Sequence, residues 1–386
     1  MSFIADLHIH SRYSRATSRA LSVSTLAGWA ACKGIGVLGS GDFTHPAWRR
    51  ELEENLVFDE ASGLYHVRGA FELPAGIARD FAGNSAPLFC LQTEISSIYK
   101  RGGKTRKIHN LVFMPDLEAV ERLCKRLALV GNLNSDGRPI LGLDSRDLLE
   151  IVLEASVKAV MIPAHIWTPW FSLFGSRSGF DSLEECYGDL SPHIFALETG
   201  LSSDPGMNRL LSALDSYVLV SNSDAHSGAN LGREANMFAG QPSYAGIFAA
   251  LRAQAKREPQ DDLSCKFLGT MEFYPEEGKY HLDGHRTCNV CLEPGQSRAL
   301  GNICPVCGKP LTIGVLNRVM ELADRASVPA LEQEPEAKML IPLAEVLSEI
   351  YETGSASKKV QECYSRLLEK LGPELDILCK IPVEDI

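Results

Sequence analysis

The chain has 386 residues, 45% of them hydrophobic, and its 38 Lys and Arg residues against 49 Asp and Glu residues give a formal net charge of −11. This length allows one large domain and at least one smaller one. The acidic balance argues against a surface that coats DNA generally, so any nucleic-acid contact needs a local basic patch. No apolar run approaches the length of a membrane span and no signal-peptide pattern opens the chain, so we expect a soluble, cytoplasmic protein without membrane contact.

Strand-like apolar runs alternate with amphipathic helical stretches up to about residue 255, a pattern typical of parallel α/β sheets and barrels. The expected strands span residues 3–7, 37–40, 88–91, 159–162, 194–197 and 217–220. The expected helices span residues 24–33, 46–56, 117–129, 145–154, 207–214 and 244–255. One segment departs from the alternation, because strand-like residues 95–99 and 108–113 flank a basic stretch with two glycines. That composition predicts a hairpin.

Acidic and imidazole side chains follow most of these apolar runs. His8 and His10 come two residues apart, so in an extended strand they share one face and both can reach one metal ion. An isolated pair of this kind is equally often structural, but its position at a strand end favours metal binding. Further residues of these types near strand ends are Asp42, His45, Glu94, His165, Glu198, Asp224 and His226. Because a parallel barrel gathers its strand ends on one rim, the sequence predicts a polynuclear metal centre.

A second metal signal lies near the end of the alternating pattern. Cys288, Cys291, Cys304 and Cys307 form two Cys-x-x-Cys pairs. Two such pairs can close around one tetrahedral ion, and four thiolates favour zinc with no open coordination position. We therefore predict a structural zinc, with the nearby His281 and His285 as ordinary structural histidines. The alternative is a redox or fortuitous cysteine cluster.

The ordered set His8-x-His10, Glu94, His109, His165 and Asp224-x-His226 resembles the PHP (polymerase and histidinol phosphatase) superfamily of metal-dependent phosphoesterases. The resemblance covers the first 230 or so residues and implies a distorted seven-stranded β/α barrel with up to three divalent ions. The chain departs from the usual pattern at two places. Arg15-Ala16-Thr17 stands where the superfamily has an Asp, and Gly41-Asp42-Phe43 replaces its Thr-Asp-His. Both departures concern the third ion.

With the four-cysteine module added, the chain resembles more specifically the endonuclease Q family. The shared fingerprints are Gly41-Asp42-Phe43-Thr44-His45-Pro46 and Ser223-Asp224-Ala225-His226-Ser227. This resemblance implies a DNA repair endonuclease that cuts 5′ to a deaminated base (uracil, hypoxanthine, xanthine) or an abasic site. The expected α/β architecture is a distorted (β/α)7 TIM-like PHP barrel over residues 1–262, a zinc module over 263–325 and a helical C-terminal region over 326–386.

The resemblance also implies roles for single residues. Asp224 is expected both to bind metal and to orient the nucleophilic water. The implied active-site ligands are His8, His10, Asp42, His45, Glu94, His109, His165, Asp224 and His226. Two to three divalent ions (zinc, manganese or magnesium) would bind there. The imidazole ligands favour zinc and manganese over magnesium. Glu198 is either a further ligand or a carboxylate that orients a metal-binding histidine.

Two segments are candidates for substrate contact. The loop behind His165 is rich in aromatic residues, which suits a flipped base, although a lid on the barrel mouth has the same composition. Its candidate residues are Trp167, Trp170, Phe171, Ser172 and Arg177. In the predicted hairpin, Lys100, Arg101 and Lys104 could neutralise phosphates, and a solvated turn is the alternative.

Three functions remain open from the sequence. The first is the nuclease, with damaged DNA and repair or replication proteins as partners and a location at the nucleoid. The second is a phosphatase acting on a small phosphomonoester, and the third is a non-catalytic nucleic-acid-binding protein. The complete ligand set argues against the third.

Overall fold

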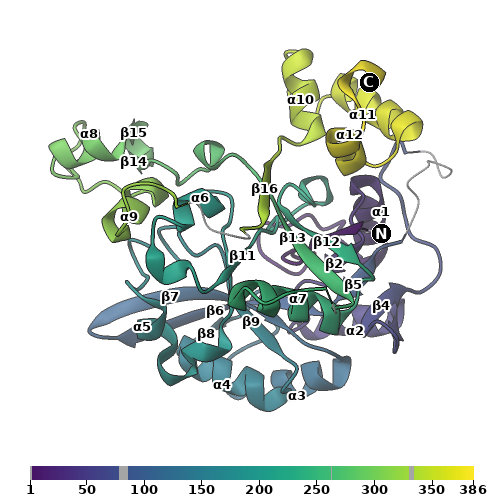
Figure 1. The fold of residues 1–386 in the computed structure, drawn as a ribbon, viewed down its shortest axis with the longest axis horizontal. Coiled ribbons are helices and arrows are strands. Elements are labelled where there is room, and N and C mark those ends of the chain that lie inside the picture. The colour runs from purple at the N-terminus through teal and green to yellow at the C-terminus, as the bar shows by residue number, and fades with distance from the viewer. Residues whose placement is uncertain (1, 78–85, 262, 330–333) are drawn as a thin grey trace.

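The computed structural model describes residues 2–77, 86–261, 263–329 and 334–386 and has a mixed α/β fold (Figure 1). The strands are β1 (Ser2–Asp6), β2 (Val37–Gly39), β3 (Leu56–Asp59), β4 (Leu64–Val67), β5 (Leu88–Cys90), β6 (Gln92–Arg101), β7 (Lys104–Phe113), β8 (Ile140–Leu141), β9 (Val160–Pro163), β10 (Ala196–Glu198), β11 (Val218–Val220), β12 (Ala235–Gly240), β13 (Cys265–Glu272), β14 (Asp283–His285), β15 (Val290–Leu292) and β16 (Glu336–Met339). The α-helices are α1 (Val23–Lys33), α2 (Pro46–Asn55), α3 (Leu117–Leu127), α4 (Ser145–Ala155), α5 (Leu183–Tyr187), α6 (Pro205–Asn208), α7 (Tyr244–Lys256), α8 (Pro294–Ala299), α9 (Val315–Leu322), α10 (Leu343–Ile350), α11 (Lys358–Leu371) and α12 (Glu374–Lys380).

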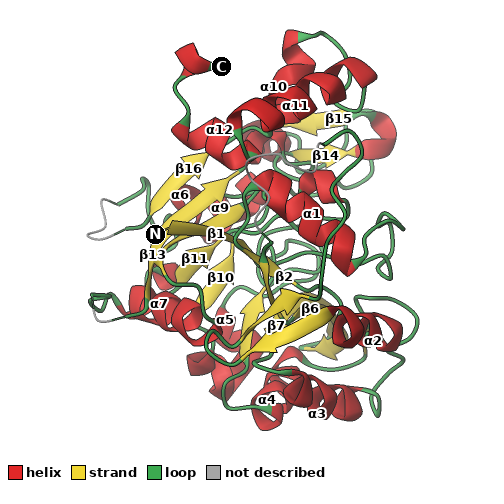
Figure 2. Ribbon diagram, turned by 90° about the vertical axis from the view of Figure 1, so that its right-hand side faces the viewer, coloured by secondary structure: helices red, strands yellow, loops and turns green. Residues whose placement is uncertain are grey.

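The strands lie at the centre of the molecule and most of the helices lie around them (Figure 2). The largest sheet has eight strands in the order β16-β13-β12-β1-β2-β5-β4-β3. A four-stranded sheet has the order β8-β6-β7-β9, and two further pairs are β10-β11 and β14-β15. Because β13 and β16 belong to the largest sheet, that sheet continues past residue 262, where we expect the barrel to end.

Strand direction differs in part from the all-parallel expectation. The pairs β1-β2, β2-β5 and β10-β11 are parallel, whereas β1-β12, β6-β7 and β7-β9 are antiparallel. The tight turn between β6 and β7 forces those two strands to run in opposite directions. Within the described residues, strand pairing yields separate sheets rather than one closed ring of seven strands.

Local sequence accounts for the start and end of several elements. Ser22 caps α1 by accepting a hydrogen bond from the Thr25 N–H, and Gly34 ends the helix with φ of 85°. In the turn of the β6-β7 hairpin, Gly102 and Gly103 have φ of 58° and 73°, values that favour glycine. The predicted hairpin is therefore confirmed.

One predicted helix is wrong. Residues 207–214 are divided between α6 and a separate single turn at Ser212–Leu214, because Leu211 between them has an extended backbone (φ −103°, ψ 112°). Asp204 caps α6 and accepts from the Met207 N–H, so the helix also begins earlier than expected.

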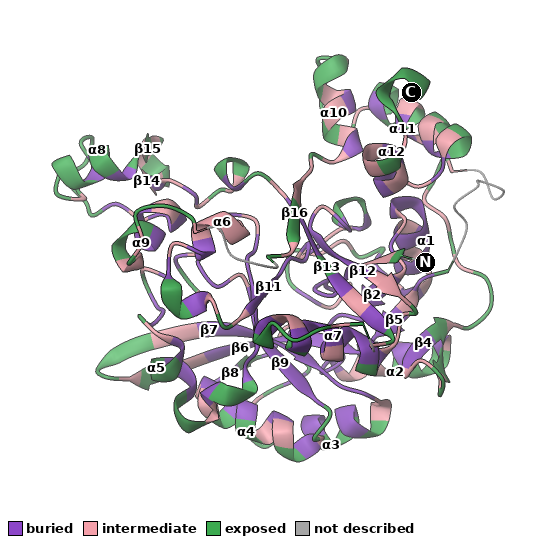
Figure 3. Ribbon diagram, viewed as in Figure 1, coloured by how far each residue is buried: buried purple, intermediate pink, exposed green. Residues whose placement is uncertain are grey.

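The core occupies both faces of the central strands, which are buried along most of their length (Figure 3). In β2, Val37 packs in the cluster that includes α7, while Leu38 packs in the cluster that includes α1 and α3. Neighbouring strand residues point to opposite faces, so this division is what a sheet covered on both sides requires.

Two smaller units lie beside the central strands in Figure 1: the lobe of α8, α9, β14 and β15, and the group of α10, α11 and α12 above α1. Each also adds residues to the main apolar cluster, Val315 and Val319 from α9 and Leu375 from α12. The C-terminal helices share an apolar cluster with Ala31 and Cys32 of α1. None of the helices in the described ranges is long and apolar enough to cross a membrane.

Candidate active site

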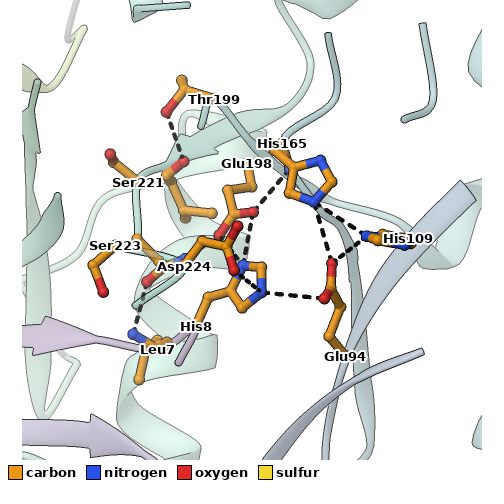
Figure 4. A network of polar contacts seen from close by, with 12 residues as sticks. Leu7, His8, Glu94, His109, His165, Glu198, Thr199, Ser221, Ser223 and Asp224 are labelled. Atoms are coloured by element: carbon orange, nitrogen blue, oxygen red, sulfur yellow. Dashed lines mark hydrogen bonds and ion pairs between the residues drawn. The ribbon is translucent and has the colours of Figure 1, made fainter. Parts of the chain in front are cut away.

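His8 and His10 follow β1 and are fully buried. Nδ1 of His8 lies 3.1 Å from each carboxylate oxygen of Glu198. Its other nitrogen, Nε2, is buried without a hydrogen-bond partner and lies 3.5 Å from Oδ1 of Asp224 and 3.8 Å from Oε2 of Glu94 (Figure 4). An imidazole fixed through one nitrogen and unpartnered at the other fits a metal ligand.

His10 has the same arrangement with a different carboxylate. Its Nδ1 lies 3.1 Å from Oδ1 of Asp42, and its Nε2 lies 3.0 Å from Oδ1 of Asp224 and 3.4 Å from Oε2 of Glu94. The donor atoms of His8, His10, Glu94 and Asp224 all lie within 4.8 Å of one another. These four residues form the first ligand group.

Glu94 also belongs to a second ligand group with His109 and His165. Oε1 of Glu94 lies 2.6 Å from Nδ1 of His109 and 3.2 Å from Nε2 of His165 (Figure 4). Glu94 therefore directs one oxygen at each group. A carboxylate shared in this way suits a centre with two neighbouring cations.

The electrostatics of both groups reflect burial opposed by close charges. Burial disfavours the charged form of His8, but the carboxylates of Glu198 and Asp224 outweigh it and raise its pKa. Burial disfavours the charged form of Glu94 as well, and His109 and Arg138 hold its pKa well below the usual range. Burial lowers the pKa of His109 to about 4. The site thus keeps carboxylates ionised in a buried position, where they attract cations.

Arg138 is a site residue that sequence reasoning missed. Its Nη1 lies 3.0 Å from Oε2 of Glu94, and its side chain is 24% exposed. It comes from the segment between α3 and β8, which has neither an apolar run nor a metal-ligand type to mark it.

Glu198 has the contacts of an orienting carboxylate. Besides His8, it accepts hydrogen bonds from the backbone N–H of His165 and from Nδ2 of Asn222, both at 2.8 Å. It thus connects the segments that follow β1, β9 and β11.

Asp42 lies outside both ligand groups. Its Oδ2 accepts hydrogen bonds from the N–H of Ser11 at 2.7 Å and from the hydroxyls of Ser11 and Ser14 at 2.6 and 2.9 Å, while Oδ1 faces His10. These contacts occupy the carboxylate that the sequence interpretation assigns to a metal.

His45 and His226 lie outside both ligand groups. Nε2 of His45 lies 3.2 Å from the Asn134 carbonyl oxygen, and its ring stacks on Tyr13 at 4.4 Å. His226 is nearer the site, with its ring 4.5 Å from that of His10, but its Nδ1 lies 2.8 Å from the backbone oxygen of Asp224. Neither imidazole belongs to a ligand group, although His45 is close in sequence to Asp42 and His226 is close in sequence to Asp224.

Three of the site residues have backbones in the left-handed region, with φ of 44° at Asp42, 30° at His165 and 46° at Asp224. Each follows a strand end, where the chain must turn sharply to aim its side chain. Such backbone strain costs about 1–3 kcal/mol per residue and persists only where the surrounding contacts hold it.

A pocket of about 640 Å³ opens beside the second ligand group. Its walls include His109, Arg138, His165, Thr168, Trp170, Phe171, Asp224, Arg233, Phe273, Lys279 and Tyr280. The rings of Trp170 and Tyr280 meet edge to face at 6.1 Å. Lys279 and Tyr280 come from the segment that leads into the cysteine module. No sequence motif marks them as pocket residues.

The rim loop, residues 167–181, supplies only two of the expected substrate residues, Trp170 and Phe171, to this pocket. Trp167 is buried against Phe174, and its Nε1 donates to Asn208. Ser172 is buried and donates to the His165 carbonyl oxygen. These two side chains therefore support the loop instead of lining the pocket.

Arg177 also points away from the pocket. Its Nη2 donates to the backbone oxygen of Leu311 at 2.5 Å, and the neighbouring Ser176 hydroxyl donates to that of Ile313 at 2.8 Å. These two hydrogen bonds thus connect the rim loop to the cysteine module.

The basic hairpin is only partly free to meet a ligand. Arg101 pairs with Asp144 at 2.7 Å and donates to the backbone oxygens of Glu185 and Cys186. Lys100 and Lys104 are exposed. Nζ of Lys107 lies 5.2 Å from the ring centre of Phe171, beside the pocket.

The cysteine module places its possible ligands differently from the four-cysteine expectation. The ligand atoms of His285, Cys288, Cys304 and Cys307 lie within 4.8 Å of one another. Cys291 is exposed and does not belong to this group. His281 is a structural histidine, with Nδ1 3.2 Å from the Ser202 carbonyl oxygen.

The profile of the MJ0043 C-terminal domain matches residues 342–386. The uncharacterized protein MJ0043 of Methanocaldococcus jannaschii is 31% identical over 241 residues, which are 62% of this chain but only 29% of that protein. The uncharacterized protein YqxK of Bacillus subtilis is 32% identical over 341 residues, 84% of this chain and 78% of that protein.

Two solved structures match the whole chain with a TM-score of 0.82 and 31% identity. One is the lesion-specific endonuclease PfuEndoQ from Pyrococcus furiosus, of which 87% is covered. The other is endonuclease Q in complex with a 27-mer duplex substrate that has an abasic lesion at the active site, of which 88% is covered. Fold and site together define a protein of the PHP superfamily. Within it, the chain belongs to the endonuclease Q family.

Proposed function

We propose that the protein is a metal-dependent DNA repair endonuclease that hydrolyses the phosphodiester 5′ to a deaminated base or an abasic site. The observation that carries the proposal is Glu94, whose two oxygens face two groups of metal-type ligands at the edge of a pocket with aromatic walls. The likeness to a lesion-specific endonuclease supports the same reaction.

The residues present fit divalent cations. The unpartnered, buried Nε2 of His8 is aimed at two carboxylates, and Glu94 offers one oxygen to each group. We assign one ion to His8, His10, Glu94 and Asp224 and another to Glu94, His109 and His165. Mixed imidazole and carboxylate ligands suit zinc or manganese better than magnesium. Bound there, such ions would neutralise the phosphate and activate water.

The side chains around these ligands would hold the substrate. Arg138 places a guanidinium at the pocket wall beside Glu94, where it can bind a phosphate oxygen. Trp170, Phe171 and Tyr280 give the pocket flat aromatic walls of the kind that accept an extruded nucleotide. The exposed Lys100 and Lys104 would contact the DNA backbone beyond the lesion.

We also keep the division into a barrel-like metallophosphoesterase part, a zinc module and a helical C-terminal region as a proposal. The separate apolar cluster of the C-terminal helices supports the last part. The enzyme would act on DNA in the cytoplasm or nucleoid, together with repair or replication proteins.

The test is a cleavage assay with end-labelled duplexes that contain one deoxyuridine, deoxyinosine, deoxyxanthosine or abasic site. Metal-stripped protein is supplied with zinc, manganese or magnesium, and products are mapped to the nucleotide. Nicking 5′ to the lesion, with an undamaged duplex left intact, is the expected result. Hydrolysis of small phosphomonoesters without duplex cleavage would favour a phosphatase, and DNA binding without any hydrolysis would favour a non-catalytic role.

Asp224→Asn tests the same reaction by removing a proposed metal ligand. Oδ1 of Asp224 lies 3.0 Å from Nε2 of His10 and 3.5 Å from Nε2 of His8. It should abolish nicking while leaving duplex binding in place. Asp147→Asn, at an exposed position on α4, is the matched control and should cut like the unmodified protein.

A further inference from the structure

We propose that Arg318 of α9 is a positioning residue, which holds the rim loop in the conformation that makes Trp170 and Phe171 part of the pocket wall. The statement that this pocket receives a lesion rests on the proposed function. The positioning itself is a property of the fold, so it can be measured without a cleavage assay.

The guanidinium of Arg318 is buried against the rim loop, and its side chain is 9% exposed. Nε donates to the Phe174 carbonyl oxygen at 3.0 Å, while Nη2 donates to the Phe180 carbonyl oxygen at 3.2 Å and pairs with the Asp181 carboxylate. Nη1 donates to Glu321 at 2.9 Å. A planar guanidinium with five N–H groups can serve these acceptors together, whereas an ammonium cannot. One side chain therefore fixes both the middle and the end of the rim loop.

The rim loop needs such a contact because its backbone is strained at the pocket. Phe171 has φ of 63°, in the left-handed region that a bulky side chain disfavours. Strain of this kind persists only where surrounding contacts hold it. The Phe171 N–H donates to the Ser178 hydroxyl at 3.2 Å, and Ser178 lies between Phe174 and Phe180, whose carbonyl oxygens Arg318 binds. Arg318 thus encloses the segment that maintains the strained conformation.

Helix α9 also contacts the other aromatic wall of the pocket. The Val315 N–H, in its first turn, donates to the Tyr280 carbonyl oxygen at 2.8 Å. Val315 and Val319 are buried in the main apolar cluster, so the helix is held in place by the core. Arg318 lies one turn after Val315 and binds the rim loop. The separation of 6.1 Å between the rings of Trp170 and Tyr280 therefore depends on a single helix that contacts both walls.

A purely structural role would make Arg318 one of several arginines that attach residues 263–329 to the rest of the chain. Arg325 is such an arginine, because it pairs with Asp215 at 2.5 Å and donates to the Arg209 carbonyl oxygen at 3.1 Å. None of these three is among the described residues that line the pocket. Arg325→Lys is therefore the matched control for Arg318→Lys, since the two would have the same effect if attachment alone mattered.

The first test is the fluorine NMR spectrum of the full-length protein labelled with 5-fluorotryptophan. The chain has four tryptophans, and Trp170→Phe identifies the signal of Trp170. Arg318→Lys should shift or broaden that signal and leave those of Trp29 and Trp48, which lie outside the rim loop, unchanged. Arg325→Lys should leave the Trp170 signal as it is in the unmodified protein. An unchanged Trp170 signal in Arg318→Lys, or changes throughout its spectrum, would overturn the proposal.

Asp181→Asn covers the case in which Arg318→Lys does not fold. The Asp181 side chain is 69% exposed, so this change removes the charge partner of Arg318 without disturbing the core. It should change the Trp170 signal in the same direction as Arg318→Lys and by a smaller amount. With an unfolded Arg318→Lys, an unchanged signal in Asp181→Asn would count against the positioning role.

The second test compares two lesions, because an abasic site presents no base to an aromatic wall and deoxyuridine does. Arg318→Lys should raise KM for a deoxyuridine duplex by about tenfold, the effect of losing one base-stacking contact, and raise KM for an abasic duplex less. It should leave kcat within about twofold, since Arg318 contacts neither ligand group. Equal losses on both duplexes, or a loss confined to kcat, would contradict the proposal. If the unmodified protein cuts neither duplex, the proposed function fails, and the fluorine spectrum still decides the role of Arg318.

Discussion

Nη1 of Arg138 lies 3.0 Å from Oε2 of Glu94, the carboxylate that both ligand groups share. The contact holds Glu94 in one orientation and places a permanent positive charge beside the cation sites. Burial disfavours the charged guanidinium, but the negative charges of Glu94 and Asp224 outweigh the effect of burial and raise the pKa of Arg138. The guanidinium is therefore charged at every pH at which the protein is folded.

Replacing Arg138 should impair turnover more than metal binding. We expect Arg138→Gln to lower kcat on a lesion-containing duplex by about 10²-fold, because a positioned donor to the developing phosphate charge is lost. Arg138→Lys should recover only part of this, since an ammonium cannot reproduce the planar fork. The exposed Arg15, which pairs with Asp136, provides the control Arg15→Gln. Single-turnover rates, with metal content measured in parallel, test this prediction. An unchanged rate in Arg138→Gln would exclude Arg138 as a donor to the developing phosphate charge.

Asp42→Asn should weaken metal binding although Asp42 is outside both ligand groups. The carboxylate fixes the ring of His10 through Nδ1, and loss of such a contact typically costs about 10- to 100-fold in metal affinity. His45→Gln should leave the affinity unchanged, because His45 faces Asn134 and Tyr13. Titration of metal-stripped protein with zinc against a competing chelator measures both. An effect of His45→Gln as large as that of Asp42→Asn would support His45 as a ligand after all.

Glu234 and Glu272 make stability depend on pH. They flank the cross-strand pair of Ala235 and Met271, both are fully buried, and each has one carboxylate oxygen without a partner. Burial raises the pKa of Glu272 to about 8 from 4.5, and burial with the neighbouring Glu272 raises the pKa of Glu234 well above its usual range. The folded state therefore binds protons that the unfolded state has released.

The free energy of unfolding should consequently fall as the pH rises from about 4.5 to about 8, by up to about 1.4 kcal/mol per pH unit for each retained proton. Glu272→Gln keeps that position neutral and should flatten the decline, with the largest gain near pH 8. Urea unfolding at pH 5, 6.5 and 8 measures the effect, and the exposed Glu276→Gln is the control. The same slope in Glu272→Gln as in the unmodified protein would be incompatible with the retained proton.

The C-terminal helices should depend on one buried ion pair. Nζ of Lys33 on α1 lies 2.5 Å from Oε2 of Glu374 on α12, which also accepts a hydrogen bond from Tyr364. Glu374→Ala leaves the ammonium buried and unpaired and should destabilise this region by about 3–5 kcal/mol. The double variant Lys33→Met, Glu374→Leu should be far less damaging, as should Glu369→Ala at an exposed position of α11. Urea titration compares the three, and a double variant as unstable as Glu374→Ala would contradict the explanation.

The sequence predicts those parts of the site that follow from local periodicity. Residues two apart share a face of a strand, which brings His8 and His10 together, and the glycine pair at 102–103 predicts the hairpin that carries Glu94 and His109 in its arms. Long-range contacts decide the rest. Arg138 comes from an irregular segment, and whether Asp42 meets a metal or a histidine depends on Ser11 and Ser14.

Spacing alone does not distinguish Cys288 from Cys291 in the cysteine module. Cys288 and Cys291 have the separation of a metal-binding turn, yet the left-handed residue lies directly after Cys288. Side-chain positions group Cys288 with Cys304, Cys307 and His285 and leave Cys291 outside this group. Similarly, Trp167 and Trp170 look equivalent in the aromatic loop, but one is 1% exposed and the other 38%.

The hydrogen bonds from Ser176 and Arg177 to the backbone of residues 311–313 have a practical consequence. A version without residues 275–325 would retain every proposed barrel ligand together with β13 and β16, and would still lose Tyr280 and the anchorage of the rim loop. Catalytic fragments made by trimming, or chimaeras that exchange only the N-terminal portion, should therefore accept lesions poorly even when fully metallated.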